Sequence, residues 1–477
     1  MKLRTLSLTL LLAGMLGGCV NLAPDYARPA APVESTWPAT GGKAVETTDD
    51  GRSAAAIGWQ DFFVDARLRQ LIELSLANNR DLRATAQAIV KARATYRIQQ
   101  AELLPALSAD AGTTARRTPA DLAGGQAVTS RTHSVALGVS GWEVDLFGRL
   151  QNLRDQALQQ YLASEDTLRS TRISLIAEVA GAYLTLSADE ALLALARDTL
   201  ASQEASQGLI RKRVEVGIGT ELDLRQIETS VETARRDVAT YTAQVAADRN
   251  ALVLLAGGPV PDSLLPPPGL DSVTALGELP VGLPSEVLRQ RPDVLAAERQ
   301  LVGAHASIGA ARAAFFPSIS LTATAGTASG SLSGLFAGGS GVWTFIPQVS
   351  LPIFNAGANQ ASLDAAKADR EIYLARYESA IQTAFREVAD ALAQRATIDD
   401  RVAAQRKLTE ATAASYRLSE ARYLKGVDSY LSTLDAQRAL YAARQSLVSL
   451  RLAAATNAVT LYKVLGGGDS ATPAPRG

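Results

Sequence analysis

The sequence contains few of the residues that most often carry chemistry. Cys19 is the only cysteine among 477 residues, which excludes intramolecular disulfides and cysteine-based metal sites. The two histidines, His133 and His305, are too isolated for a catalytic triad or a metal centre, and no phosphate-binding loop is present. We therefore predict a protein that is not an enzyme and that binds no metal or dissociable cofactor.

An excess of one charge and long apolar runs are also missing. The net charge is −1, so the sequence gives no sign of the basic surface that nucleic acids require. Beyond the N-terminal 18 residues, no segment offers about 18 uninterrupted apolar residues. We expect no nucleic-acid partner and no membrane-spanning helix in the mature chain.

The N-terminus has the pattern of a bacterial lipoprotein signal. A basic start and an apolar run lead to Leu16-Gly17-Gly18-Cys19, a small-small-Cys cleavage box. We predict that residues 1–18 are a signal peptide and that Cys19 carries an N-acyl group such as palmitate and an S-diacylglycerol. The alternative is an ordinary signal peptide with an incidental cysteine. Because residue 20 is Val and not Asp, outer-membrane delivery is favoured, with residues 19–58 as an extended, acylated segment rich in Pro, Ala and Thr.

The rest of the chain is a tandem duplication. Residues 81–107 recur as residues 293–319 at a constant offset of 212, and a second pair of blocks follows at an offset of 209. A repeat of this length indicates that each half is one large supersecondary unit and not a turn of a short-period solenoid. Matching residues include Asp81 and Asp293, Pro105 and Pro317, Arg213 and Arg422, Gly217 and Gly426, and Leu222 and Leu431.

Each half contains two stretches in which apolar and polar residues alternate. We predict strands at about 106–117 and 131–145 in the first half, and at about 318–328 and 342–354 in the second. Apolar residues occupy one face and mostly hydroxyl residues the other, as in the strands of a transmembrane β-barrel. A soluble sandwich has the same two-residue period, and the alternation alone does not decide between the two.

Four strands per chain are too few to close a barrel. Roughly eight strands are the smallest number that leaves no free edge. If these strands meet lipid, several copies must share one barrel. The oligomer is then obligatory.

Most of the remaining sequence is helical in pattern. We predict a first helix from Leu68 to Leu104, ended by Pro105, a long helix from Asn152 to about Arg213, and a returning helix from Glu221 to Leu255. The returning helix of each half carries a heptad stripe typical of a coiled coil. The two stripes are Val231, Val238, Val245 and Leu252, and Leu440, Leu447, Ala454 and Leu461.

Short glycine-containing interruptions predict two hairpin tips, at about 215–221 and 425–430. In the first, Gly217 ends one helix and Thr220 is the candidate N-cap of the next. In the second, Gly426 and Ser429 occupy the same positions.

These segments predict two repeats, at 59–258 and 285–466, joined by a proline-rich linker at 259–284 and followed by a disordered tail at 467–477. Each repeat is predicted to have the element order helix, strand, strand, long helix, tip, returning helix. The predicted fold class is mainly α with a smaller β portion, which is a membrane β-barrel portion if the strands meet lipid.

Several motifs resemble those of a known family. Asn78-Asn79-Arg80-Asp81-Leu82-Arg83 lies in the first helix, and Ala310-Ala311-Arg312-Ala313-Ala314-Phe315-Phe316-Pro317 ends its counterpart in the second repeat. Pro347-Gln348-Val349-Ser350-Leu351-Pro352-Ile353-Phe354-Asn355 ends the last strand. Together they are similar to the outer membrane factors of tripartite efflux pumps, specifically the lipoprotein branch of the TolC-like channels.

This resemblance implies a homotrimer in which twelve strands form one outer-membrane barrel above a periplasmic tunnel of twelve helices. The implied partners are a periplasmic adaptor, or membrane fusion protein, and an RND-type inner-membrane transporter that supplies the energy. The implied function is passive exit of drugs or other small molecules, and hence multidrug resistance. The competing hypothesis is a periplasmic coiled-coil scaffold or adaptor lipoprotein without a pore, which leaves the four amphipathic strands unexplained.

The residues and the resemblance agree on a candidate gate. Leu431 and Asp435 are four positions apart on one helical face, roughly opposite the stripe that begins at Leu440. The family has its narrowest constriction at matching positions. The alternative is that Asp435 is simply a solvated acid near a helix start, where the helix dipole favours negative charge.

Two residues just before the second tip, Arg422 and Tyr423, match candidate latches of the family. The first repeat has Leu222 and Gln226 in place of Leu431 and Asp435. An acidic ring in a trimer would therefore hold three carboxylates and not six.

Overall fold

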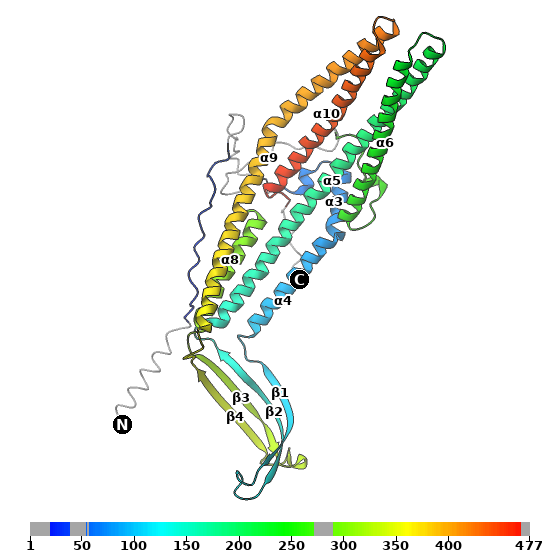
Figure 1. The fold of residues 1–477 in the computed structure, drawn as a ribbon. Coiled ribbons are helices and arrows are strands. Elements are labelled where there is room, and N and C mark those ends of the chain that lie inside the picture. Colours follow the sequence, from blue (N-terminus) through cyan, green and yellow to red (C-terminus); the bar gives the residue numbers. More distant parts are fainter. Residues whose placement is uncertain (1–19, 39–53, 55–56, 271–289, 469–477) are drawn as a thin grey trace. The chain divides into compact units, whose positions relative to one another are not determined.

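The computed structural model describes residues 20–38, 54, 57–270 and 290–468 (Figure 1). The predicted signal peptide, Cys19, and most of the tail lie outside the described residues, as does much of the predicted linker. The chain divides into two compact units, each assembled from segments far apart in the sequence. Unit 1 comprises residues 1–30, 88–165 and 296–377, and unit 2 comprises residues 31–87, 166–295 and 378–477.

The order of elements repeats, as expected of a duplication. The two longest helices, α5 and α9, each have 67 residues. In chain order the helices and strands are α2 (Trp59–Phe62), α3 (Ala66–Asn78), α4 (Arg80–Ala101), β1 (Leu107–Thr118), β2 (Val128–Val144), α5 (Arg149–Glu215), α6 (Glu221–Ala256), α8 (Pro292–Ala313), β3 (Ser318–Ser329), β4 (Gly341–Ser350), α9 (Ala358–Leu424) and α10 (Tyr430–Val464).

Unit 1 contains a four-stranded antiparallel sheet in the order β1-β2-β3-β4. Its register brings the apolar residues of all four strands onto one face, because residues directly opposite each other point to the same side. One row across the sheet is Leu107, Val139, Ala323 and Phe345. The next row is Ala109, Leu137, Ala325 and Trp343, and its alternate face bears Ser108, Thr324 and Thr344.

A bulge in β2 keeps this face continuous. Val139 pairs with Ala323 and Trp142 with Leu321, so β2 uses one residue more than β3 over the same distance. Without that extra residue, Trp142 would point to the polar face. Gly141 adopts a φ of 65°, and its N–H donates to the Thr322 hydroxyl at 3.0 Å. The left-handed backbone favours glycine at this position.

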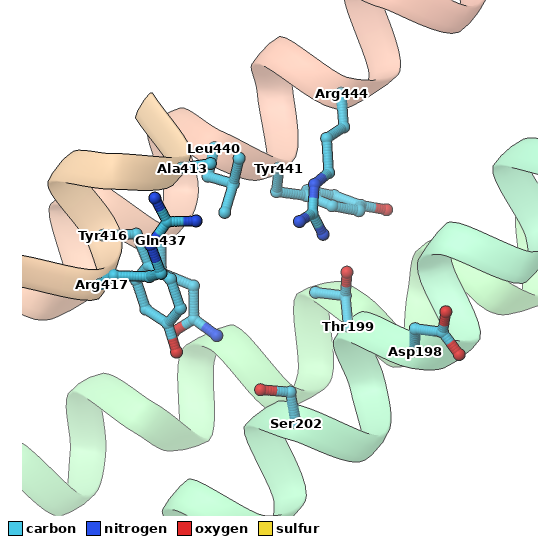
Figure 2. A pocket seen from close by; sticks show the side chains of 10 residues that line it. All are labelled: Asp198, Thr199, Ser202, Ala413, Tyr416, Arg417, Gln437, Leu440, Tyr441 and Arg444. Atoms are coloured by element: carbon cyan, nitrogen blue, oxygen red, sulfur yellow. The ribbon is translucent and has the colours of Figure 1, made fainter. Parts of the chain in front are cut away.

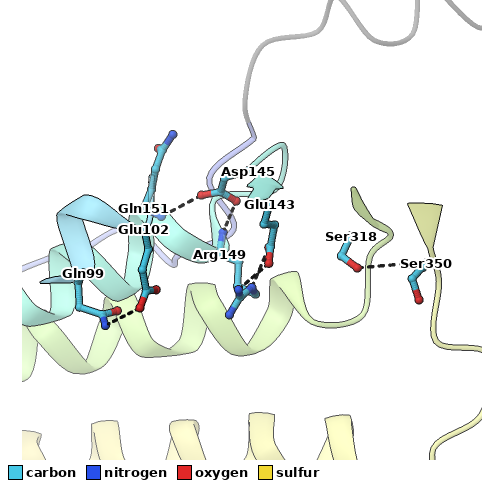
Figure 3. A network of polar contacts seen from close by, with 8 residues as sticks. All are labelled: Gln99, Glu102, Glu143, Asp145, Arg149, Gln151, Ser318 and Ser350. Carbon is cyan, nitrogen blue, oxygen red and sulfur yellow. Dashed lines mark hydrogen bonds and ion pairs between the residues drawn. The ribbon is translucent and has the colours of Figure 1, made fainter. Parts of the chain in front are cut away.

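The junction from β2 into α5 is held by carboxylates (Figure 3). Asp145 accepts from the backbone N–H groups of Arg149 and Gln151 at 2.7 and 2.8 Å, which satisfies donors that the first turn of α5 leaves free. The Arg149 guanidinium donates twice to Glu143 at 2.9 and 2.6 Å. These bonds fix the end of β2 to the first turn of α5.

Residues 20–30 form neither helix nor strand and pack within unit 1. The Val20 N–H donates to the Leu146 carbonyl at 3.2 Å, next to the end of β2. Arg28 donates twice to Glu298 of α8, at 2.6 and 2.9 Å, and the Tyr26 hydroxyl donates to the same carboxylate at 2.9 Å. Since Glu298 is largely buried, these three bonds compensate the desolvation of its charge.

Unit 2 holds the main hydrophobic core. The Tyr462 ring stacks on Phe62 at a centroid distance of 3.6 Å, and its hydroxyl donates to the Ile57 carbonyl at 2.6 Å. The middle of α5 supplies much of this core, including Ile176 and Tyr183. One window of α5 is apolar enough to span a membrane, with a mean hydropathy of 1.3, but 56% of it is buried within the protein. Core packing therefore accounts for its composition.

The prediction of one continuous helix from Leu68 to Leu104 was wrong. The structure breaks it at Asn79, where ψ is 131°, and separates α3 from α4. The Asn79 side chain accepts from the Leu82 N–H at 3.0 Å and donates to the Leu255 carbonyl at the end of α6, also at 3.0 Å. One asparagine thus caps two helices, and this tertiary bond outweighs local helical continuity.

Candidate functional site: the hairpin tips

The first tip joins α5 to α6 through a tight reversal. Gly217 has a φ of 77°, and the N–H groups of Ile218 and Gly219 both donate to the Arg213 carbonyl at 2.9 Å. The Thr220 side chain accepts from the Asp223 N–H at 3.1 Å and caps α6. The C-terminal carbonyls of one helix and the N-terminal N–H groups of the next are thus satisfied within a few residues.

The second tip has the same backbone but different side-chain bonds. Gly426 has a φ of 74°, and the Val427 N–H donates to the Arg422 carbonyl at 3.0 Å. Ser429 occupies the predicted N-cap position of α10 and makes no side-chain capping bond. The neighbouring Asp428 instead accepts from Arg422 at 2.5 and 2.9 Å. This pairing holds the pKa of the Asp428 carboxyl below its usual range.

One position changes the partner of the arginine that precedes each tip. Gly219 and Asp428 are equivalent in the duplication, so Arg422 has an acid six residues ahead of it and Arg213 does not. The Arg213 guanidinium lies instead over the ring of Tyr423, at 5.0 Å from its centroid. Contacts of this kind contribute about 0.5–2 kcal/mol. The candidate latch Tyr423 is therefore bound by the other hairpin of the same chain.

An apolar cluster lies beneath this contact. It contains Ile210 of α5, Ile227 and Val231 of α6, and Tyr430 and Leu434 of α10. The rings of Tyr423 and Tyr430 meet edge-on at 5.3 Å. Burial raises the pKa of both phenols, so both are neutral hydrophobic groups at physiological pH. The first and second hairpins are thus joined near their tips by packing and by a single cation–π contact.

The candidate gate residues Leu431 and Asp435 lie on the opposite side of α10. Tyr430, Thr433 and Leu434 are buried, whereas Leu431 is 47% exposed and Asp435 is also exposed. Asp435 has no ion-pair partner among the residues that the structure describes. Within the described part of the chain, no hydrogen bond or ion pair holds either side chain in place.

A polar cleft of about 250 Å³ separates the two hairpins farther from the tips (Figure 2). Two hydrogen bonds close it on the α6 side, from the Tyr441 hydroxyl to Asp237 at 3.2 Å and from Gln445 to the Tyr241 hydroxyl at 2.9 Å. A water-accessible gap of this size adds no hydrophobic stabilisation between the hairpins. Its lining is Asp198, Thr199 and Ser202 of α5, Ala413, Tyr416 and Arg417 of α9, and Gln437, Leu440, Tyr441 and Arg444 of α10.

Two carboxyl groups meet between α5 and α6. Burial, together with the neighbouring carboxyl group of Asp189, raises the pKa of Asp248 to about 6. Among the described residues the buried Oδ2 of Asp248 has no hydrogen-bond partner. One step along the helices, Arg249 pairs with Glu190 at 2.9 Å. The acid pair therefore destabilises the first hairpin when both carboxyl groups are ionised.

Sequence reasoning placed both tips and missed their contacts. The roles of Arg213 and Asp428 depend on which hairpin lies beside which. A comparison of the repeats shows that only the second arginine has an acid six residues later, so the asymmetry was visible in the sequence.

Comparisons with known proteins match almost the whole chain. A family described as outer membrane efflux protein matches residues 71–258 and 283–467. The chain is 50% identical over 459 residues to the toluene efflux pump outer membrane protein TtgC of Pseudomonas putida, spanning 96% of this chain and 94% of TtgC. It is 44% identical over 460 residues to outer membrane protein OprJ of Pseudomonas aeruginosa, spanning 96% and 95%.

Solved structures show the same similarity. A membrane protein from Pseudomonas aeruginosa has a TM-score of 0.88 at 43% identity, covering 94% of this chain and 100% of its own. The open state of the MtrE outer membrane channel of Neisseria gonorrhoeae has a TM-score of 0.84 at 39% identity, covering 94% and 98%.

Proposed function

Because the chain belongs to the outer membrane efflux protein family, and is thus the outer-membrane channel component of an efflux pump that extends into the periplasm, we propose that three copies of it form one passive exit duct. A periplasmic adaptor and an RND-type inner-membrane transporter would complete the pump. The transporter would supply the energy. The duct itself would catalyse no reaction and would need no cofactor.

One observation carries this proposal: the sheet of unit 1 has an apolar face and a polar face that both run across all four strands. The apolar side chains are exposed in the single chain, including Trp343 at 78% and Phe345 at 58%. A face of this kind would be covered by lipid in a membrane. The polar face would then line a water-filled passage.

The open edges of the sheet support the proposed trimer. In one chain β1 and β4 each have an unpaired side, and open edges are not tolerated in lipid. Pairing β4 of one copy with β1 of the next closes the barrel, and three copies give twelve strands. The same arrangement would place three sets of α5, α6, α9 and α10 around a periplasmic tunnel.

The names of two relatives suggest which compounds the duct would transport. TtgC is named for toluene efflux, and ArpC of Pseudomonas putida, also 50% identical, for antibiotic efflux. We propose that this duct likewise passes small organic compounds, including drugs. The transporter would set the selectivity.

The gate would lie at the hairpin tips. A ring of three Leu431 and three Asp435 side chains would narrow the closed tunnel, and the contact between Arg213 and Tyr423 would hold the second hairpin inward. Adaptor binding would open the ring by separating the hairpins along the polar cleft.

Acylation of Cys19 would add an anchor. The next residue, Val20, is bonded to Leu146 beside the helix-connected end of the sheet, where the inner leaflet of the outer membrane would begin. Metabolic labelling with a palmitate analogue should mark the wild type and not Cys19→Ala. Labelling of the variant at the wild-type level would contradict this part of the proposal.

The test of the duct is reconstitution of the purified full-length protein. We expect detergent-dependent trimers that cross-link to a threefold mass and that conduct ions in planar bilayers. Expression with the cognate adaptor and transporter should restore drug resistance to an efflux-deficient strain. A monomer that is soluble without detergent and forms no conducting species would support the competing scaffold function instead.

A further inference from the structure

The apolar face of the sheet changes character at its loop end. Toward the helices this face carries Leu, Val, Phe and Trp. Toward the loops it carries Arg117 on β1 and Arg131 on β2. Both side chains are exposed, and neither has an ion-pair partner in the part of the chain that the structure describes.

The register places the two arginines side by side. Arg131 is opposite Ala115 and Arg117 is opposite Thr129, so the two are diagonal neighbours two residues apart along the strands. Ala115 and Arg117 share the face of Leu107, because residues two apart along a strand point to the same side. Arg131 shares it through its pairing with Ala115.

A row of polar side chains lies between the apolar band and the two arginines. The next row toward the membrane is Thr113 opposite His133, and the Thr113 hydroxyl is hydrogen-bonded to the His133 ring at 2.8 Å. Beyond that row, Ala111 and Val135 begin the apolar band. In an inserted sheet the arginines would therefore lie just outside the hydrocarbon layer.

The chain path identifies this boundary as the outer one. Each strand is joined to a periplasmic helix at one end, with α4 leading into β1 and β2 into α5. The loop between β1 and β2 is at the opposite end. In an outer-membrane barrel that end faces the cell exterior, at the level of the outer-leaflet headgroups.

We propose that Arg117 and Arg131 form a binding site for the phosphate groups of an outer-leaflet lipid. A guanidinium group binds phosphate through two parallel hydrogen bonds, and two such groups on one side of a sheet can hold one phosphorylated headgroup while its acyl chains follow the apolar band. The inference rests on the proposed barrel, since only insertion brings lipid to this face.

The adjacent residue provides a matched control. Arg116 is opposite Ser130 and points to the polar face, so Arg116→Gln removes the same charge from the same strand without touching the lipid side. We would compare Arg116→Gln, Arg117→Gln and Arg131→Gln as purified full-length trimers. Each would be titrated with lipid A, with dephosphorylated lipid A and with inorganic phosphate, and binding measured by native mass spectrometry.

The wild type should prefer lipid A over its dephosphorylated form. Arg117→Gln and Arg131→Gln should each weaken lipid A binding about fivefold, which corresponds to about 1 kcal/mol per basic side chain at an anionic membrane surface. Arg116→Gln should bind as the wild type does. Inorganic phosphate should not displace the lipid.

Three results would overturn the assignment: equal losses for all three variants, equal binding of the dephosphorylated lipid, or displacement by inorganic phosphate, which would indicate a free-anion site. Conductance separates this inference from the proposed function. Conducting wild-type trimers with no preference for phosphorylated lipid would refute the lipid site alone. A wild type that neither trimerises nor conducts would refute the duct.

Discussion

The orientation of the sheet can be tested at two consecutive residues of β4. Phe345 lies in the row of Leu107, Val139 and Ala323, within the apolar band, whereas Thr344 belongs to the hydroxyl-bearing face. If the apolar face meets lipid, Phe345→Arg places a charge in the hydrocarbon. Thr344→Arg places the same charge in the aqueous interior.

The expected penalty for Phe345→Arg has two parts. An arginine near the middle of the lipid-facing band costs about 2–4 kcal/mol. The Phe345 side chain is 58% exposed in the single chain, so lipid would cover a little over half of it, and losing that burial costs about 1–2 kcal/mol more. The sum is about 3–6 kcal/mol per protomer. For Thr344→Arg we expect a change of less than about 1 kcal/mol.

Both variants can be compared by urea titration of folded protein in lipid vesicles, with heat-modifiable gel mobility as a second readout and outer-membrane abundance in cells as a third. Phe345→Arg should lower the unfolding midpoint and the abundance, while Thr344→Arg should match the wild type. Equal tolerance of both substitutions, or a greater loss for Thr344→Arg, would show that the faces are assigned the wrong way round or that the sheet does not meet lipid.

Three further predictions concern the helices. Asp435→Ala should raise ion and antibiotic leakage through the closed trimer, whereas Gln226→Ala, its counterpart in the first repeat, should not; unchanged conductance of Asp435→Ala would exclude it from the gate. Tyr423→Ala removes the surface on which Arg213 stacks and should increase channel opening in bilayers by about two- to thirtyfold, the equivalent of 0.5–2 kcal/mol; an unaltered open fraction would refute the latch. Because the folded state raises the pKa of Asp248 from 3.8 to about 6, its stabilising contribution is complete below about pH 4 and is lost as the pH rises through 6. Asp248→Asn should therefore flatten the thermal stability between pH 4 and 6 and, after allowance for its partial exposure to solvent, stabilise each protomer by about 1 kcal/mol at pH 7; a variant with the pH profile of the wild type would contradict the raised pKa of Asp248.

Local patterns predicted much of the fold. Alternation indicated all four strands, and the structure places them at Leu107–Thr118, Val128–Val144, Ser318–Ser329 and Gly341–Ser350. The long helices end within a few residues of the predicted limits, because glycine at the tips and proline before the strands act on the backbone within one turn. The break at Asn79 was missed, since its side chain bonds to a carbonyl 176 positions away.

The sequence likewise predicted one part of the candidate site and missed another. Helical spacing alone placed Leu431 and Asp435 on the face opposite the heptad stripe, and the structure leaves both exposed. The latch residues were identified by resemblance, but their contacts were not. Arg422 pairs with Asp428 inside its own tip, and Tyr423 meets Arg213 from the other hairpin.

The sequence by itself determined the duplication, the order of the elements, the two-faced character of the strands and the positions of the tips, because each of these depends on residues close together in the chain. Only the tertiary structure decided how the repeats meet. The pairing of β2 with β3, the bulge that returns Trp142 to the apolar face and the stacking of Arg213 on Tyr423 all join residues about 180 to 210 positions apart. Such pairings are selected by the packing of whole elements against one another, which no local pattern encodes.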